Sequence, residues 1–310
     1  MDPGRQRRRR ARPFALAVAA ALTAVACGPA PSTSPLHSAA CARTFVAAAG
    51  GVVTDARINE ASGMVASRTQ PGVFWVHNDS GDSPRIFAID TTGATRAVFE
   101  VAGATATDWE DIAMGPGPVA GVEYLYIGDI GDNSRNRTSI QVYRVPEPTV
   151  PTANGTYTLS GAARLNLTYP NGARNAESLL VDPRNAEITV VMKRVSNEPI
   201  RVYRAPANLA AGSTTAMIDV GGLALPGTTS NATGIDITRD ARAITLRTYA
   251  NVYVYNNANL GTVQSALATL PCAANTLAEA QGETIAIHAD DNGYTTLSEG
   301  TNRPLNNHDV

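Results

Sequence analysis

A three-part phrase of short strand-like runs recurs along the chain and constrains its fold more than any other feature. In the clearest copy, residues 107–145, TDWEDIA is followed by YLYIGD and then by IQVYRV, with Gly- and Asn-rich turns between them. Equivalent first runs open the other copies at 59–65, 174–180, 231–237 and 280–286. Antiparallel units of about four strands at this spacing are typical of the blades of a β-propeller. We therefore predict an all-β propeller, since short alternating runs dominate and helical periodicity is lacking.

The number of copies predicts five blades, or six if the longest gap between copies hides another. That gap contains the insertion PEPTVPTANGTYTLSG (146–161). The last copy lacks a fourth run, whereas the N-terminal run TFVAAAGGVV (44–53) belongs to no copy. We expect this N-terminal strand to complete the last blade and close the ring, which removes the exposed sheet edges. Fourth strands are expected in the other copies at TRAVFEV (95–101), ARLNLTY (163–169), TTAMIDV (214–220) and TVQSALATL (262–270).

Residues 1–26 have the pattern of a secretory signal peptide. Six arginines within the first thirteen residues precede an apolar run, 14–26, that is too short to span a bilayer and ends in Ala-Val-Ala. A basic nuclear or nucleic-acid signal is the alternative interpretation of the arginines. Removing 1–26 takes away six arginines and one aspartate, so the formal net charge falls from −2 to −7. Such a charge disfavours nucleic acid as a partner and is compatible with cation binding.

The residue after the predicted cleavage site is Cys27, followed by a Pro/Ser-rich stretch. This arrangement resembles a bacterial lipoprotein signal, which implies a lipidated flexible tether over 27–43 and a propeller domain over 44–310, outside the cytoplasmic membrane. Lipid on Cys27 leaves Cys41 and Cys272 as a pair, and a disulfide between them would close a loop of 231 residues. The alternative is a freely secreted chain with a spare thiol.

Polar residues recur at two matching positions of the first runs. The innermost strand of a blade lines the central channel, and side chains two residues apart on a strand share a face. One column contains Ser62, Glu110, Glu177, Thr233 and Glu283, and the column two residues earlier contains Glu60, Asp108, Asn175, Asn231 and Gln281. The ends of the second runs add His77, Asn78, Asp79, Asp129, Asp132, Asn133, Lys193, Arg194, Arg247, Tyr249, Ser298 and Glu299. We expect these side chains to gather at one channel mouth.

Carboxylates gathered in this way repel one another, by roughly 2 kcal/mol for a pair about 7 Å apart at an effective dielectric constant near 20. Three interpretations remain open. The acids accept hydrogen bonds from the backbone of the neighbouring blade, or Glu110, Glu177 and Glu283 bind a hard cation such as Ca²⁺, or two of them form a catalytic pair. Lys193, the only lysine of the chain, and Arg247 are candidates to hold an anionic group.

Other candidates have a plain structural interpretation beside the functional one. His77 is either a general base or a hydrogen-bonded residue at a strand end. Asp79-Ser-Gly-Asp82 and Asp129-Ile-Gly-Asp132 are either Asx-turn loops or ion sites. The sequence contains no GxSxG, HExxH, CxxC, GxxxxGK or GxGxxG motif in a suitable context, and its four histidines do not have zinc-site spacing.

The run GETIAIHADDNGYTTLSEG (282–300) resembles the blade unit of secreted phytase-like propellers and of SdiA-regulated-type propellers. DWEDIA and NAESLL resemble the start of the same unit. The resemblance implies a propeller with acidic channel residues, usually of six blades, and for phytases a calcium-dependent phosphatase. Our leading hypothesis is a binding or scaffold domain that holds a small molecule or a protein at the acidic mouth. The alternative is a calcium-dependent phosphoric ester hydrolase.

Overall fold

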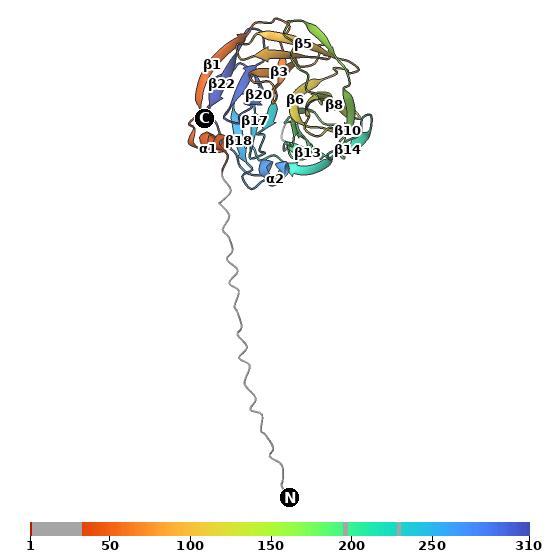
Figure 1. Ribbon diagram of the computed structural model, residues 1–310, viewed down its shortest axis with the longest axis vertical. Coiled ribbons are helices and arrows are strands. Elements are labelled where there is room, and N and C mark those ends of the chain that lie inside the picture. Colours follow the sequence, from red (N-terminus) through yellow and green to blue (C-terminus); the bar gives the residue numbers. More distant parts are fainter. Residues whose placement is uncertain (2–32, 195–197, 228–230) are drawn as a thin grey trace. The chain divides into compact units, whose positions relative to one another are not determined.

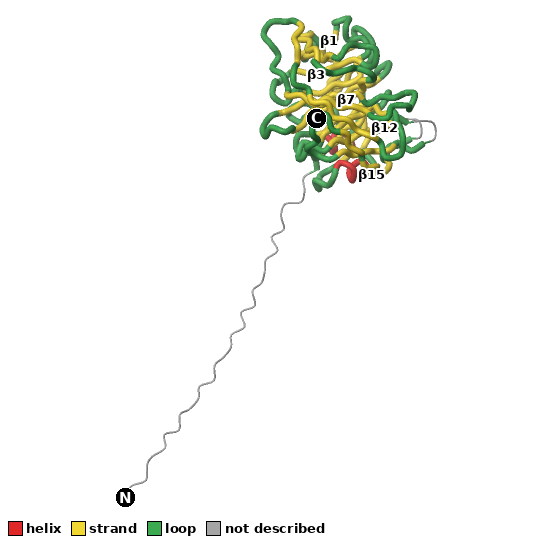
Figure 2. The backbone as a smooth tube through the Cα atoms, turned by 90° about the vertical axis from the view of Figure 1, so that its right-hand side faces the viewer, coloured by secondary structure: helices red, strands yellow, loops and turns green. Residues whose placement is uncertain are grey.

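The computed structural model describes residues 1, 33–194, 198–227 and 231–310. The described residues from 33 onward form five small sheets arranged in a ring, which is a five-bladed β-propeller (Figure 1). Strands dominate, and Figure 2 shows how little helix accompanies them. No helix in the described ranges is long and apolar enough to cross a membrane.

Each blade is a sheet whose main strands run antiparallel and follow one another outward from the channel. Blade one contains β2 (Ala61–Ala66), β3 (Val73–Asn78), β4 (Arg85–Asp90) and β5 (Thr95–Val101). Blade two contains β6 (Trp109–Pro116), β7 (Glu123–Asp129), β8 (Ile140–Pro146) and β10 (Ala163–Thr168). Blade three contains β11 (Ala176–Val181), β12 (Ile188–Met192), β13 (Arg201–Ala205) and β15 (Ile218–Gly222).

Blade four contains β16 (Gly234–Ile237), β17 (Ala243–Arg247), β18 (Val252–Asn256) and β19 (Cys272–Ala273). Blade five contains β20 (Gly282–Ile287), β21 (Gly293–Ser298), β22 (Arg303–Asp309) and β1 (Val46–Val53). The inner strands are almost wholly buried on both faces, because each blade packs against a neighbour on either side. The apolar core is accordingly divided into clusters between successive blades.

The insertion 146–161 does not hide a sixth blade. Its strand β9 (Thr156–Leu159) pairs in parallel with β5 and becomes a fifth, outermost strand of blade one. Strand β14 (Thr214–Ala216) likewise pairs in parallel with β10 at the edge of blade two. Five blades are therefore confirmed, and the extra residues protect a sheet edge.

The N-terminal strand closes the ring, as predicted. In Figure 1 the orange β1 lies beside the blue β22, and the two pair antiparallel from Val46 opposite Asp309 to Val53 opposite Arg303. Gly51 lies at an irregularity of this pairing, where a Cβ atom would come within 2.1 Å of the Thr92 carbonyl oxygen. Only glycine permits this close approach of the closing strand to a turn of blade one.

The prediction of a flexible tether over 27–43 is wrong for residues 35–42. Residues 35–42 form helix α1 (Pro35–Ala42), and the side chains of Leu36, Ala39 and Ala40 are buried against blades four and five. Three apolar side chains on one helical face give this short segment enough contact to order it. Cys27 and residues 2–26 of the predicted signal peptide lie outside the described residues.

The predicted fourth strand at 262–270 is also wrong, because this segment contains helix α2 (Val263–Leu267). Thr262 caps the helix, its side-chain oxygen accepting a hydrogen bond from Ser265 N at 3.1 Å. Val263, Ala266 and Leu267 follow at helical spacing and are buried. The outer strand of blade four is instead the two-residue β19.

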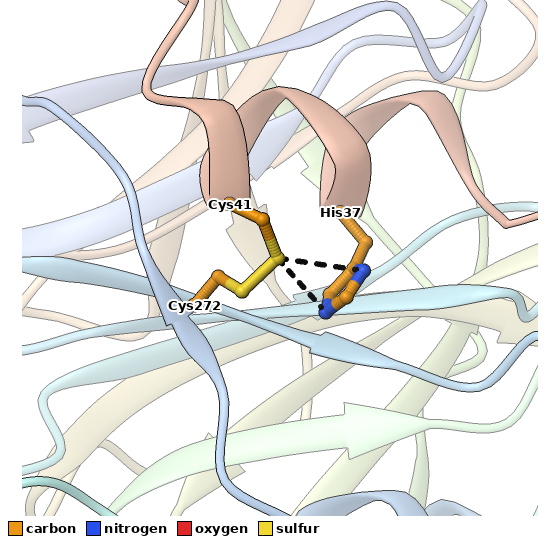
Figure 3. A group of neighbouring side chains, drawn as sticks. All are labelled: His37, Cys41 and Cys272. Carbon is orange, nitrogen blue, oxygen red and sulfur yellow. Dashed lines mark hydrogen bonds between the residues drawn. A yellow bond between two sulfur atoms is a disulfide. The ribbon is translucent and has the colours of Figure 1, made fainter.

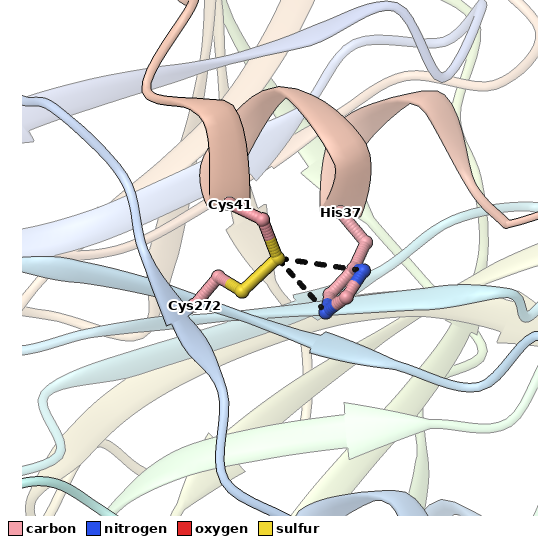
Figure 4. Close-up of a disulfide and its surroundings, with 3 residues drawn as sticks. All are labelled: His37, Cys41 and Cys272. Atoms are coloured by element: carbon pink, nitrogen blue, oxygen red, sulfur yellow. Dashed lines mark hydrogen bonds between the residues drawn. A yellow bond between two sulfur atoms is a disulfide. The ribbon is translucent and has the colours of Figure 1, made fainter.

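A disulfide joins Cys41 of α1 to Cys272 of β19, with the two Cα atoms 4.9 Å apart (Figure 3). The bond links the segment before the closing strand to the outer edge of blade four. His37 lies one helical turn before Cys41, with its ring beside the sulfur of Cys41 (Figure 4). The predicted pairing of these two cysteines is present, and it reinforces the ring next to its closure.

Candidate functional site

The column residues of the inner strands sit at β-bulges at one mouth of the channel. The pairing with the second strand shifts register around Ser62, Glu110, Glu177 and Glu283 in four of the five blades. A bulge adds one residue to a strand and re-aims its side chain. We call the region formed by Asp79, Asp108, Glu110, Glu177, Lys193, Tyr249 and Glu283 the acidic mouth.

The uncharged members of the column join neighbouring blades. The Ser62 hydroxyl donates to the Glu110 carbonyl oxygen at 2.7 Å, and the Thr233 hydroxyl donates to the Gly282 carbonyl oxygen at 2.9 Å. Each bond connects the start of one inner strand to the start of the next. These short side chains therefore have a structural role at the mouth.

Three carboxylates converge on one side of the acidic mouth. Asp79 follows β3, Asp108 precedes β6, and Glu110 lies in β6; one oxygen of each lies within 4.8 Å of the others. Glu110 is only 4% exposed, and its carboxylate forms no hydrogen bond with any described residue. A Cβ atom on Gly131 would lie 2.3 Å from Glu110 Oε1, so glycine leaves room for the acids.

Burial and the charges of neighbouring carboxylates raise the pKa values of Asp108 and Glu110. Burial, followed by the charges of Glu177, Asp79 and Asp108, raises the pKa of Glu110 well above its ordinary value. Burial and then the charge of Asp79 raise the pKa of Asp108 to about 6. A carboxylate without hydrogen bonds in such a place requires a proton or a cation.

The other side of the acidic mouth contains the single lysine. Lys193 forms an ion pair with Glu177 Oε1, and its Nζ lies 5.8 Å from the centre of the Tyr249 ring. The second oxygen, Oε2 of Glu177, is buried without a hydrogen bond in the described structure. Glu283 accepts a hydrogen bond of 2.9 Å from Gln281 Nε2. The predicted ligand Glu110 thus groups with Asp79 and Asp108, whereas Glu177 and Glu283 have partners of their own.

The pKa values of Glu177 and Glu283 are also raised, to about 7 and about 8, with burial as the largest cause. The ammonium group of Lys193 lowers both and so partly opposes burial. Glu299, a less buried neighbour, has a pKa raised by burial and then by Glu60 and Asp79. Glu60 itself is exposed at the rim.

Arg247 does not present a free cation to the acidic mouth. Its Nη2 lies 2.8 Å from Glu279 Oε2, and the two side chains are 1% and 2% exposed. Glu279 also accepts hydrogen bonds from Thr296 Oγ1 and Asn306 Nδ2. A Cβ atom on Gly282 would meet Arg247 Nη2 at 1.8 Å. The guanidinium therefore lies between blades four and five in a buried ion pair.

His77 is likewise a packed residue. The side chain is fully buried, its Nδ1 donates to the Asn78 carbonyl oxygen at 2.8 Å, and its ring packs edge-on against Trp109 at 5.5 Å. Burial lowers its pKa. This arrangement matches the hydrogen-bonded interpretation of His77.

Asp129 and Asp132 organise the loop that follows β7. Asp129 accepts from Asp108 N at 3.0 Å and from Arg137 Nη1 at 2.8 Å. Asp132 accepts from Asn136 N at 3.0 Å and from Arg137 N at 2.8 Å. These bonds match the turn interpretation of the loop. They also hold Asp108 in its place at the acidic mouth.

Two buried aspartates outside the predicted site residues accept hydrogen bonds from neighbouring blades. Asp111 accepts from Leu179 N of blade three at 2.8 Å, and Asp236 accepts from Ile287 N of blade five at 2.8 Å. Bonds from an acid to the backbone of a neighbouring blade are thus made by Asp111 and Asp236, which do not belong to the predicted columns. The sequence signal that could have identified Asp111 and Asp236 is an acidic residue within an otherwise apolar inner strand.

The fold and the site define the chain as a five-bladed β-propeller with an acidic mouth at one end of its channel. Comparison with protein-family models finds no match, and comparison with curated proteins finds no significant match. The resemblance to phytase-like and SdiA-regulated-type propellers therefore depends on the short blade motifs alone.

The raised pKa values imply that the protein loses stability as pH rises. The folded state holds protons on Glu177 and Glu283 up to about pH 7 and 8, whereas an ordinary glutamate releases its proton near 4.5. The folded state thus binds more protons than the unfolded state between these limits, so the free energy of unfolding falls across this window. We expect Glu283→Gln to be more stable than the parent at pH 8, by about 1–3 kcal/mol, and about equal at pH 4.

Urea unfolding at pH 4, 6 and 8 in the presence of EDTA measures this difference. Glu100→Gln, which removes an exposed carboxylate from β5, is the matched control. A parent protein whose stability rises from pH 5 to 8 in EDTA would contradict the assignment of protons to the acidic mouth.

Proposed function

We propose that the protein is a binding module in which a hard divalent cation, with Ca²⁺ as the leading candidate, is held by Asp79, Asp108 and Glu110. The observation that carries the proposal is the buried Glu110 carboxylate, which has no hydrogen bond within the described part of the chain and faces two further carboxylates within 4.8 Å. A bound cation would offset the burial and the mutual repulsion that raise the pKa values of Glu110 and Asp108.

The spacing of the three oxygens suits calcium. Ca²⁺–oxygen bonds are about 2.3–2.6 Å long, so two ligands of one ion lie at most about 5 Å apart. Three side chains supply fewer than the six to eight oxygens that Ca²⁺ takes. The remaining positions would be filled by water and by the oxygens of a ligand. An anionic group such as a carboxylate or phosphate fits this arrangement, with the ammonium group of Lys193 nearby.

We further propose that the protein acts outside the cytoplasmic membrane, anchored by lipid on Cys27. The Cys41–Cys272 disulfide supports an oxidising compartment. The signal-like pattern of residues 1–26 and the cysteine that follows it support export and lipidation. Globomycin-sensitive processing and loss of membrane attachment in Cys27→Ser test this proposal.

Calcium binding is tested on metal-free protein by calorimetry and thermal unfolding. We expect Ca²⁺ to bind and to stabilise the parent by about 2.7 kcal/mol at a concentration one hundred times its dissociation constant. Glu110→Gln is expected to lose this response while being more stable than the parent in EDTA at pH 7, because the folded parent must keep a proton on Glu110 that an ordinary glutamate has released at this pH. Glu100→Gln should retain the parent response. Absence of Ca²⁺, Mg²⁺ and Mn²⁺ binding below millimolar concentration would contradict the proposal.

A metal-assisted hydrolase of phosphate esters is the second candidate. It is favoured by the two carboxyl groups of Glu177 and Glu283, whose pKa values of about 7 and 8 suit proton transfer near neutral pH. Turnover of p-nitrophenyl phosphate and phytate with calcium, lost on addition of EDTA and in Glu177→Gln, would establish it. Calcium binding without turnover would contradict the hydrolase and support the binding module.

A further inference from the structure

A second cavity lies at the end of the inner strands opposite the acidic mouth. It has a volume of about 590 Å³ and opens between blades one and five, where Ala66 ends β2 and His288 follows β20. This volume falls in the range of small-molecule sites, about 300–1,000 Å³. Pro71, Val73 and Phe74 give one wall of the cavity an apolar character.

Another wall of the cavity is polar, and two hydrogen-bond acceptors, His288 Nδ1 and Asp309 Oδ1, lie close together in it. Thr295 Oγ1 donates to Asn307 Oδ1 at 2.8 Å and must therefore accept the bond of 2.9 Å from His288 Nε2. The proton of a neutral imidazole is thus on Nε2, which leaves Nδ1 as an acceptor. His288 Nδ1 lies 3.5 Å from Asp309 Oδ1. Burial lowers the pKa of His288, which favours this neutral form.

The wall that contains His288 and Asp309 carries a net negative charge. Asp290 also lines the cavity, and neither it nor Asp309 forms an ion pair with an arginine or lysine in the part of the chain that the structure describes. Arg68 lines the same cavity, but its guanidinium lies against Glu123, at 3.7 Å, and the Ile237 carbonyl oxygen, at 3.5 Å. Adjacent acceptors with net negative charge favour a cationic donor over a neutral one.

We propose that this cavity binds a small molecule that carries a primary ammonium group on an apolar body. The ammonium group donates hydrogen bonds to His288 Nδ1 and the Asp309 carboxylate, and the body packs against Phe74, Val73 and Pro71. A primary ammonium has three donors, so it satisfies both acceptors together. The site is independent of the acidic mouth and of the cation proposed there.

Titration calorimetry with phenethylamine in the presence of EDTA tests the proposal, with 2-phenylethanol as the uncharged analogue of the same shape. We expect phenethylamine to bind at least tenfold more tightly than 2-phenylethanol, because an ionised donor forms the stronger hydrogen bonds. Asp309→Asn should weaken phenethylamine binding about tenfold, whereas Glu100→Gln, an exposed carboxylate outside the cavity, should not.

Thr91→Trp places a bulky side chain at the exposed rim of the cavity and should abolish binding of both compounds. Its thermal unfolding, compared with that of the parent, shows whether the variant is folded. Equal binding of the amine and the alcohol, or equal losses in Asp309→Asn and Glu100→Gln, would overturn the proposal. So would the absence of phenethylamine binding below 10 mM, on the order of the weakest binding expected of a specific site.

Discussion

Glu279→Ala is expected to lower the free energy of unfolding by about 3–5 kcal/mol, because it leaves a buried guanidinium without its counter-ion. Arg247 is held at Glu279 between blades four and five, where its Nε and Nη1 already have no hydrogen-bond partner among the described residues. Thr296 and Asn306 would lose their acceptor as well. Urea unfolding at pH 7 measures the loss.

The matched control is Glu198→Ala, which breaks the exposed ion pair between Glu198 and Arg135. Surface pairs contribute about 0–1 kcal/mol, so this variant should be nearly as stable as the parent. Replacing both partners, as Arg247→Met with Glu279→Leu, should recover much of the stability, because no buried charge remains. Equal losses in Glu279→Ala and Glu198→Ala would show that the buried pair does not stabilise the fold.

Cys41→Ser is expected to lower the free energy of unfolding by about 2–5 kcal/mol, since the disulfide removes entropy from a long unfolded loop. The bond closes 231 residues and fastens α1 beside the closure of blade five. Loss of the bond also frees the segment that precedes β1. Limited proteolysis should therefore cut the variant between α1 and β1 faster than the parent.

Reduction of the parent with dithiothreitol provides the internal control for this prediction. The reduced parent, Cys41→Ser and Cys272→Ser should unfold at similar urea concentrations, and dithiothreitol should not affect either variant. A Cys41→Ser protein as stable as the oxidised parent would mean that pairing of β1 with β22 suffices for closure.

Much of the architecture could be predicted because blades are local units. The recurring runs and turns place the strands, and the unpaired run at 44–53 indicates how the ring closes. The pairing of Cys41 with Cys272 was predicted by counting cysteines, given lipid on Cys27. The helices were harder to predict, because Thr262 and three apolar side chains at helical spacing are the only sequence signal for α2.

The repeat spacing and the run compositions by themselves determined the propeller, its closure by the N-terminal strand and the convergence of acids on one end of the channel, whereas the choice between five and six blades came from the pairing of β9 with β5. Only the tertiary structure decided the partners of those acids. Bulges aim Glu110 toward Asp79 and Asp108, while Lys193 reaches Glu177, and Arg247 turns away into a buried pair with Glu279. The reason is physical: strand period is set by neighbours in the chain, whereas the direction and solvation of a side chain are set by blades that pack beside it.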